Sequence, residues 1–374
     1  MLLLATEVWK SHGGIQRYMR IVTRILANRD DRLTVLTLLD DDIHRPDEFA
    51  GFSAICCNGS KWKFCAQALR LAKKGAAETS VVGHVALAPV AWILHVLGLI
   101  QHYVVILHGI EAWHRVPWIY RAAIRRAATT IATTRYTARE FCFFNGLPAA
   151  KCITIPLACG FRQPAARPAA PAANIRILTV CRLSASEGYK GVDTVLHAMR
   201  LACDRELTVT VEVVGEGDDR RRLEDLSRSL GIDALVHFHG SVSDEELGRL
   251  FSQSHIFVMP SRKEGFGIVF LEAMSAGLPC IGANHGGTPE VIDHGESGFL
   301  IEYGDVAQLA FYLGEFLAAP GLYDKMSNAA RRRAPETPEC DLMGRAWRDL
   351  ADRFQKADNP GPRSQQVAAA GTDR

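Results

Sequence analysis

The feature that most constrains the fold is the alternation of short apolar runs with longer amphipathic stretches. Apolar runs of four or five residues are typical of strands buried on both faces, as in parallel sheets covered by helices. In the front half they predict strands at Leu2–Ala5, Thr34–Leu38, Val104–Leu107 and Thr130–Ala132. Between the first two strands, apolar spacing predicts one buried face of a helix that begins near Gly14: Ile15, Tyr18, Val22 and Ile25. The pattern therefore indicates an α/β fold.

The chain is long enough for two such domains, because 374 residues exceed what one ordinary core supports. Residues 161–173 contain three prolines and no apolar periodicity, which predicts a linker. A second series of strands is predicted at Ile177–Cys181, Val209–Val214, Val236–His239, Ile256–Met259 and Cys280–Ala283. The predicted organisation is a domain over 1–160, a linker over 161–173, a domain over 174–340, a helix over 341–357 that packs back on the first domain, and a disordered tail over 358–374.

Cysteine spacing and hydropathy argue against a zinc protein, a disulfide scaffold and a membrane-spanning protein. The 10 cysteines form no Cys-x-x-Cys pair and no Cys/His pair at metal-ligand spacing, which argues against a zinc site and a disulfide scaffold. The first apolar run is too short for a signal peptide, so a reduced cytoplasmic protein is predicted. Val81–Ile100 contains no Asp, Glu, Lys or Arg, but its glycines and Pro89 favour a strand, a turn and an apolar helix over a membrane span.

Charge is distributed unevenly along the chain. Residues 1–160 carry 19 Lys and Arg against 11 Asp and Glu, whereas the remainder carries 24 against 30. The stretches Lys61–Gly75 and Arg115–Arg126 also interleave basic residues with Trp62, Phe64 and Trp118. Such stretches are either ordinary amphipathic helices or surfaces that dock on anionic lipid headgroups, and the residues alone leave both open.

The segment Pro260–Ile281 is the most informative for chemistry. A predicted strand ends in a loop with Glu264 and two glycines, and an apolar helix runs from about Ile268 to Ala276. Free N–H groups at the start of that helix favour an anion such as a pyrophosphate. Glu272 lies among apolar residues of the helix, where a carboxylate needs a polar partner. Eight helical residues span ~12 Å. The two glutamates are therefore too far apart to act as paired glycosidase carboxylates, which lie ~5–10 Å apart. We expect them to hold opposite ends of an elongated ligand.

Five segments, in this order along the chain, together resemble the family 4 retaining glycosyltransferases of GT-B fold. They are SHGGIQRYMR (Ser11–Arg20), LHGIEAW (Leu107–Trp113), CRLSASEGYKG (Cys181–Gly191), EGFGIVFLEAMSAGLP (from Glu264) and HGGTPEVI (His285–Ile292). The resemblance covers nearly the whole chain. It implies two Rossmann-like parallel-sheet domains that face an interdomain cleft.

The resemblance also implies a role for each matching residue. Gly13 and Gly14 are expected to approach the donor's distal phosphate, and His108 to contact the donor sugar. Arg182 and Lys190 are expected to bind the pyrophosphate, and Glu264 the sugar hydroxyls. The remaining donor-binding residues implied are Gly215, Val242, Gly265, Phe266, Gly267, Ile268 and Glu272, of which Gly215 and Val242 border the base and Glu272 the ribose. Front-face displacement, with the donor phosphate assisting deprotonation, requires no protein nucleophile.

Metal and cofactor chemistry is assigned no role. Asp40-Asp41-Asp42 matches the Asp-x-Asp string of metal-dependent transferases, but its place after a strand predicts a solvated turn. A dinucleotide-dependent oxidoreductase is disfavoured because Arg220 stands where a third glycine is needed after Gly215 and Gly217. A GT-B epimerase and a non-catalytic sugar-nucleotide-binding subunit remain as alternatives.

The predicted substrates follow from the same resemblance. Residues 182–199 are most similar to mannosyl- and hexosyltransferases of bacterial exopolysaccharide synthesis, which favours GDP-mannose over a UDP-hexose as donor. The expected acceptor is a saccharide or a polyprenyl-diphosphate-linked saccharide. Because many members use lipid-linked acceptors, the resemblance favours the membrane interpretation of the basic stretches. A peripheral protein on the inner face of the cytoplasmic membrane is therefore predicted, with no nucleic-acid partner and no specified oligomeric state.

Overall fold

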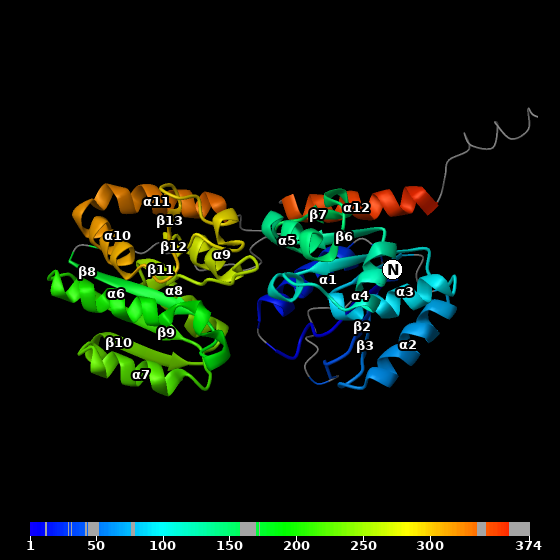
Figure 1. The fold of residues 1–374 in the computed structure, drawn as a ribbon, viewed down its shortest axis with the longest axis horizontal. Helices are drawn as coiled ribbons and strands as arrows, with labels where there is room; N and C mark the ends of the chain where they lie inside the picture. The colour runs from blue at the N-terminus through cyan, green and yellow to red at the C-terminus, as the bar shows by residue number, and fades with distance from the viewer. Residues whose placement is uncertain are drawn as a thin grey trace, which may run out of the picture. The chain divides into compact units, whose positions relative to one another are not determined.

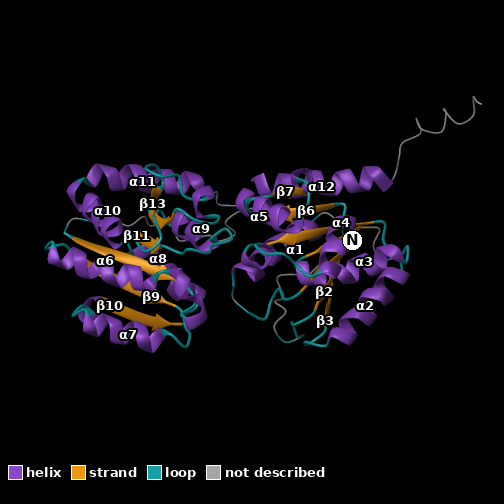
Figure 2. Ribbon diagram, viewed as in Figure 1, coloured by secondary structure: helices purple, strands orange, loops and turns teal. Residues whose placement is uncertain are grey.

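The computed structural model describes residues 1–358 apart from 12, 29, 31, 42, 44–51, 76–78, 158–169, 172 and 335–341. Contacts divide this part of the chain into two α/β units (Figures 1 and 2). The first unit contains Met1–Thr133, Thr137–Pro156 and helix α12 (Leu342–Asp358). The second contains Thr134–Tyr136 and the elements from β8 to α11. The predicted linker and tail lie almost entirely outside the described residues.

The first unit is built on a seven-stranded parallel sheet with strand order β3-β2-β1-β4-β5-β6-β7. Its strands are β1 (Leu2–Ala5), β2 (Thr34–Thr37), β3 (Ser53–Cys56), β4 (Thr79–Val82), β5 (His102–Leu107), β6 (Thr129–Ala132) and β7 (Cys152–Thr154). Strand β1 is entirely buried and pairs with β2 on one side and β4 on the other. The four strands that apolar runs predict in this half are confirmed.

Helices cover this sheet and bury apolar side chains against it. They are α1 (Gly14–Ala27), α2 (Lys61–Lys73), α3 (Ala88–Val96), α4 (Trp118–Arg126) and α5 (Arg135–Asn145). Tyr18, Val22 and Ile25 of α1 are buried, as their spacing predicts, and α1 also contacts α12. The apolar stretch Val81–Ile100 ends β4 and forms α3, with Pro89 in the first turn of the helix. No helix in the described part combines the length and apolar character that crossing a bilayer requires.

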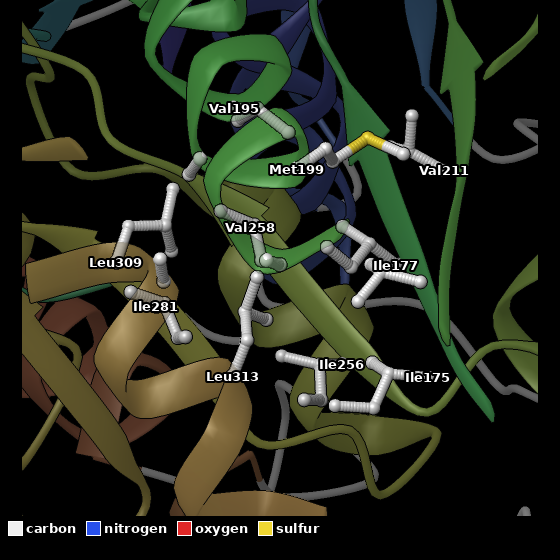
Figure 3. Packing of buried hydrophobic residues seen from close by; sticks show 14 of the residues in the cluster. Ile175, Ile177, Val195, Met199, Val211, Ile256, Val258, Ile281, Leu309 and Leu313 are labelled. Carbon is white, nitrogen blue, oxygen red and sulfur yellow. The ribbon is translucent and has the colours of Figure 1, made fainter. Parts of the chain in front are cut away.

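The second unit contains a six-stranded parallel sheet with strand order β10-β9-β8-β11-β12-β13. Its strands are β8 (Asn174–Val180), β9 (Thr208–Val214), β10 (Val236–Gly240), β11 (Ile256–Met259), β12 (Cys280–Ala283) and β13 (Gly298–Ile301). Its helices are α6 (Val192–Asp204), α7 (Arg220–Ser229), α8 (Asp244–Gln253), α9 (Ile268–Ser275), α10 (Val306–Ala318) and α11 (Pro320–Arg333). Figure 3 shows Met199 of α6 and Leu313 of α10 packing on one face of this sheet, which includes Val258 of β11.

The strand order shows where, in each sheet, successive connections lead to opposite sides of the first strand. In the first sheet the chain runs from β1 outward to β2, and β4 then starts the other side. In the second sheet it runs from β8 outward to β9 and β10, and β11 starts the other side. Open α/β sheets bind ligands at the carboxyl ends of strands beside such a switch point. The loops after β1, β4, β8 and β11 are therefore the places to search for a site.

Candidate functional site

The loops after β8 and β11 bring Lys190 and Glu264 together. These residues are 74 positions apart in the sequence, yet Lys190 Nζ lies 2.8 Å from Glu264 Oε2. The pairing follows from the topology, because β8 and β11 are neighbours and their following loops leave the same edge of the sheet. The sequence predicted that both residues bind the donor, and the structure places them in direct contact.

Backbone contacts between the same two loops fix this arrangement. The Arg262 N–H donates to the Tyr189 carbonyl at 2.9 Å. Gly191 has a φ of +83°, and a Cβ there would lie 2.6 Å from the Pro260 carbonyl oxygen. A glycine is required at this position because it permits both the left-handed backbone and the close approach of the second loop.

The two predicted phosphate-binding cations, Lys190 and Arg182, differ in how far they are enclosed. Burial disfavours the charge on Lys190, but the attraction and hydrogen bond of Glu264 outweigh it, so the pKa of the Lys190 ammonium is raised. Only 18% of the Lys190 side chain and 15% of the Glu264 side chain remain exposed. Arg182 pairs instead with Glu187 at 3.0 Å, and 68% of its side chain is exposed. The loop after β8 therefore carries one enclosed cation and one accessible cation.

Helix α9 begins directly after the Glu264 loop. Gly267 precedes its first residue, Ile268, with a φ of +84°, and a Cβ there would lie 2.5 Å from the Phe270 ring. Phe266 is buried in the core beside this turn. Glu272 lies in the middle of the helix with 4% of its surface exposed. The helix start, where the Phe270 N–H donates to the Gly267 carbonyl at 3.0 Å, lies next in sequence to Glu264 of the pair.

Gly215 and Val242, which were predicted to border the base, follow β9 and β10. Gly215 has a φ of +141°, and a Cβ would lie only 1.8 Å from the Cys181 carbonyl oxygen. This glycine is therefore explained by packing of the loop after β9 against the loop after β8. Val242 is half-buried after β10. Their predicted contact with a base remains a prediction.

In the first unit, Gly13 and Gly14 form the start of α1, as predicted. The Gly13 carbonyl accepts the first backbone hydrogen bond of the helix, from Arg17 N–H at 2.9 Å. Gly13 has no side-chain cap, and a Cβ there would lie 2.5 Å from Gln16 Oε1. The loop that leads to this glycine pair follows β1 at the switch point of the first sheet.

The prediction that Asp40 lies in a solvated turn is wrong. Asp40 is fully buried, and its carboxylate accepts the backbone N–H groups of Val8, Trp9 and Lys10 at 2.8, 3.1 and 2.9 Å. Asp41 lies 3.5 Å from Lys10 Nζ, and residue 42 lies outside the described part. Among the described residues, no group of three or more His, Cys, Asp and Glu is placed to hold a metal ion. Asp40 therefore has a structural explanation, the folding of the loop after β1.

His108 follows β5 and is 7% exposed. Its Nε2 lies 2.6 Å from the Gly83 carbonyl oxygen, and burial lowers its pKa. Glu111 accepts the backbone N–H groups of His108 and Gly109 at 2.6 and 3.1 Å, which closes the turn after the strand. Sequence reasoning missed Glu111 and also His84, whose ring faces that of His108. Strand β4 ends at Val82 and His84 lies two residues further on, so its place just after a buried apolar run was the available signal.

Two glycosyltransferase family models together match most of the chain. Residues 12–158 match the family model described as "Glycosyltransferase Family 4", and residues 168–333 match "Glycosyl transferases group 1". A mannosyltransferase of Mycolicibacterium hassiacum, the MMP alpha-(1->4)-mannosyltransferase, is 35% identical over 43% of this chain and 39% of its own length. The GDP-mannose-dependent alpha-(1-6)-phosphatidylinositol monomannoside mannosyltransferase of Mycobacterium tuberculosis is 32% identical over 56% and 59%. The matched region thus spans less than two thirds of these relatives.

Among solved structures, Anabaena HepE in complex with UDP and glucose superposes with a TM-score of 0.74. The match covers 95% of this chain and 99% of that one at 20% sequence identity. At this identity the likeness speaks for the fold alone. The predicted GT-B class, with two Rossmann-like parallel-sheet domains, is confirmed.

Proposed function

Because this chain belongs to the family 4 glycosyltransferases, we propose that it transfers a hexose from a nucleotide sugar to an acceptor. We further propose that transfer retains the anomeric configuration and needs no metal. The observation that carries the proposal is the Lys190–Glu264 pair at the switch point of the second sheet. A cation and a carboxylate in contact at this edge suit a ligand that combines phosphate groups with sugar hydroxyls.

The chemistry of the leaving group gives these residues their proposed roles. Departure of a nucleoside diphosphate leaves negative charge, and fixed cations in an enclosed site stabilise it best. Lys190 and Arg182 are proposed to bind the diphosphate, assisted by backbone N–H groups at the start of α9. In the structure both cations are paired with carboxylates, Lys190 with Glu264 and Arg182 with Glu187. A bound diphosphate would supply the anion in their place and leave Glu264 to accept hydroxyl groups of the donor sugar.

We propose GDP-mannose as the first donor to test and a UDP-hexose as the second. The Mycobacterium tuberculosis relative is named for its dependence on GDP-mannose, and the Anabaena structure holds UDP. The proposed acceptor is a saccharide or a polyprenyl-diphosphate-linked saccharide. The experiment is a thermal-shift screen of both donors, followed by a nucleotide-release assay with acceptor. A donor at a hundredfold excess over its Kd should stabilise the protein by about 2.7 kcal/mol. Stabilisation without turnover of either donor would indicate a non-catalytic binding subunit instead.

We also propose that α2, α3 and α4 dock on the anionic inner face of the cytoplasmic membrane. Helix α3 contacts both α2 and α4. None of the three contains Asp or Glu, and α2 and α4 contain seven Lys and Arg. Trp62 and Trp118 are 89% and 69% exposed. The exposed large apolar residues of this surface are Trp62, Ile93, Val96, Leu97 and Trp118.

Liposome binding tests the membrane proposal. Each Lys or Arg near an anionic surface contributes about 1 kcal/mol, so vesicles rich in anionic lipid should bind the protein and neutral vesicles should not. High salt, or charge reversal at Lys61, Lys63, Lys73 and Lys74, should release it. Arg221→Glu in the second unit is the matched control and should leave binding unchanged. Equal binding to neutral and anionic vesicles would contradict the proposal without affecting the transferase assignment.

A further inference from the structure

Two histidines meet at the carboxyl edge of the first sheet. His84 follows β4 and His108 follows β5, and these strands are neighbours. Their rings are nearly parallel, with centroids 6.2 Å apart and an interplanar angle of 25°. Tyr18 of α1 lies edge-on to the His108 ring, with centroids 5.4 Å apart. The pair therefore lies beside the switch point of the first sheet.

The hydrogen bonds of His84 determine which ring nitrogen carries the proton. The Ala86 backbone N–H donates to His84 Nδ1 at 3.1 Å, so Nδ1 carries no hydrogen. In the neutral ring Nε2 must then be the N–H donor. Burial and the nearby His108 lower the pKa of His84, in agreement with a neutral ring. Within the described part of the chain, Nε2 of this half-buried residue forms no hydrogen bond.

The tautomer of His108 is the reverse. Its Nε2 donates to the Gly83 carbonyl, so in the neutral ring Nδ1 is the acceptor. Glu111 folds the turn that holds this ring, because its carboxylate accepts the His108 and Gly109 N–H groups. Two neighbouring imidazoles thus differ in function: His84 offers a donor and His108 an acceptor. A hydroxyl group can satisfy both, since its oxygen accepts one hydrogen bond while its hydrogen is donated in another.

We propose that His84 and His108 together bind one hydroxyl group of a sugar substrate, with His84 Nε2–H donating to its oxygen and His108 Nδ1 accepting its hydrogen. This inference rests on the proposed glycosyltransferase function and adds His84 as a substrate-binding residue. A sugar that lacks this hydroxyl, or carries it in the other configuration, leaves both nitrogens without a partner. Sites built around a hydroxyl discriminate strongly against analogues that lack it.

Two substitutions at His84 distinguish a role in substrate binding from a role in capping the turn through the Ala86 N–H. Asn at position 84 can accept the Ala86 N–H but cannot reach as far as Nε2, whereas the amide of Gln reaches that far but is a poorer cap. We expect His84→Asn to lower kcat/KM about tenfold and His84→Gln to remain within about threefold of the wild type. The assay is release of nucleoside diphosphate from GDP-mannose or UDP-glucose, whichever the wild-type protein turns over. It is run below the unfolding transition of every variant, which circular dichroism establishes.

The source of the hydroxyl is distinguished by the acceptor and by deoxy sugars. If the donor sugar supplies it, the defect of His84→Asn persists when water replaces the saccharide acceptor, and one deoxy donor abolishes the difference from wild type. If the acceptor supplies it, the defect appears only with a polyprenyl-diphosphate-linked saccharide, and a deoxy acceptor abolishes it. Wild-type kcat/KM in His84→Asn, together with a defect in His84→Gln, would show that the ring only caps the turn and would overturn the inference. Turnover by the wild type tests the proposed function separately.

Discussion

Substitution of Lys190 by alanine removes one member of an enclosed ion pair and should lower both stability and activity. Hydrogen bonds to charged groups contribute about 1.5–3 kcal/mol, and removal of one partner of a buried pair costs about 3–5 kcal/mol. With 18% and 15% of the two side chains exposed, the pair is nearly but not fully buried. We therefore expect Lys190→Ala to reduce the free energy of unfolding of the second unit by about 2–3 kcal/mol. It should also lower kcat/KM about 10²–10³-fold, as loss of a charge-stabilising group does.

Arg182→Ala is the matched control for this stability effect. Arg182 lies in the same loop and has the same proposed ligand, but its bond to Glu187 is exposed. Exposed ion pairs contribute about 0–1 kcal/mol, so this variant should lose activity with little change in unfolding. A double-mutant cycle of Lys190→Ala with Glu264→Gln should give a coupling energy of about 1.5–3 kcal/mol.

The assay can separate the two units. All six tryptophans belong to the first unit, so their fluorescence follows its unfolding in urea, whereas far-UV circular dichroism follows both units. Lys190→Ala should shift the dichroism transition and leave the fluorescence transition unchanged. Additive effects of the two substitutions in the cycle, or equal destabilisation by Arg182→Ala, would refute the reasoning.

Three further predictions follow from the described contacts. Asp40→Ala should lower the free energy of unfolding by about 3 kcal/mol, seen as an earlier fluorescence transition in urea, because three backbone N–H groups, two of them buried, lose their acceptor. Activity should survive excess EDTA, and restoration of a lost rate by magnesium or manganese would contradict the metal-free proposal. The lowered pKa values of His84 and His108 mean that the unfolded chain binds more protons. Their contribution to stability should therefore be present above about pH 6.5 and be lost as the pH falls below it, a trend that urea titrations at several pH values would test.

The sequence predicts most central strands but only one of the four edge strands, β10. Predicted strands Ile256–Met259 and Cys280–Ala283 are confirmed with the same bounds. The missed strands β3, β7 and β13 are all at sheet edges. An edge strand pairs on one side only and needs a weaker apolar run, as the half-buried β7 illustrates. Burial alone does not decide which strands are predicted, because the partly exposed β10 was predicted and the largely buried β13 was missed.

In the candidate site, the motifs identified individual residues, and the three-dimensional structure was needed to show their contacts. The motifs identified Lys190 and Glu264 separately, but their ion pair depends on β8 and β11 being neighbours. Gly215 was assigned to the base, yet its contact with the Cys181 carbonyl gives it a packing role that sequence spacing cannot reveal. His84 carried no motif of its own and became a candidate only through the ring it faces.

Asp40 illustrates why residue type and local spacing do not decide the role of an acidic run. Three consecutive aspartates after a strand resemble both a solvated turn and a metal-binding string, and neither interpretation considers the loop after β1. That loop ends beside Gly13 and needs acceptors for backbone N–H groups that no strand satisfies. Asp40 follows β2, the neighbour of β1, so its carboxylate reaches those groups across the sheet edge. The carboxylate is thereby committed to the backbone of Val8, Trp9 and Lys10. Asp40 therefore supports the glycine loop, which the family resemblance predicts to approach phosphate, by holding the chain that leads to Gly13.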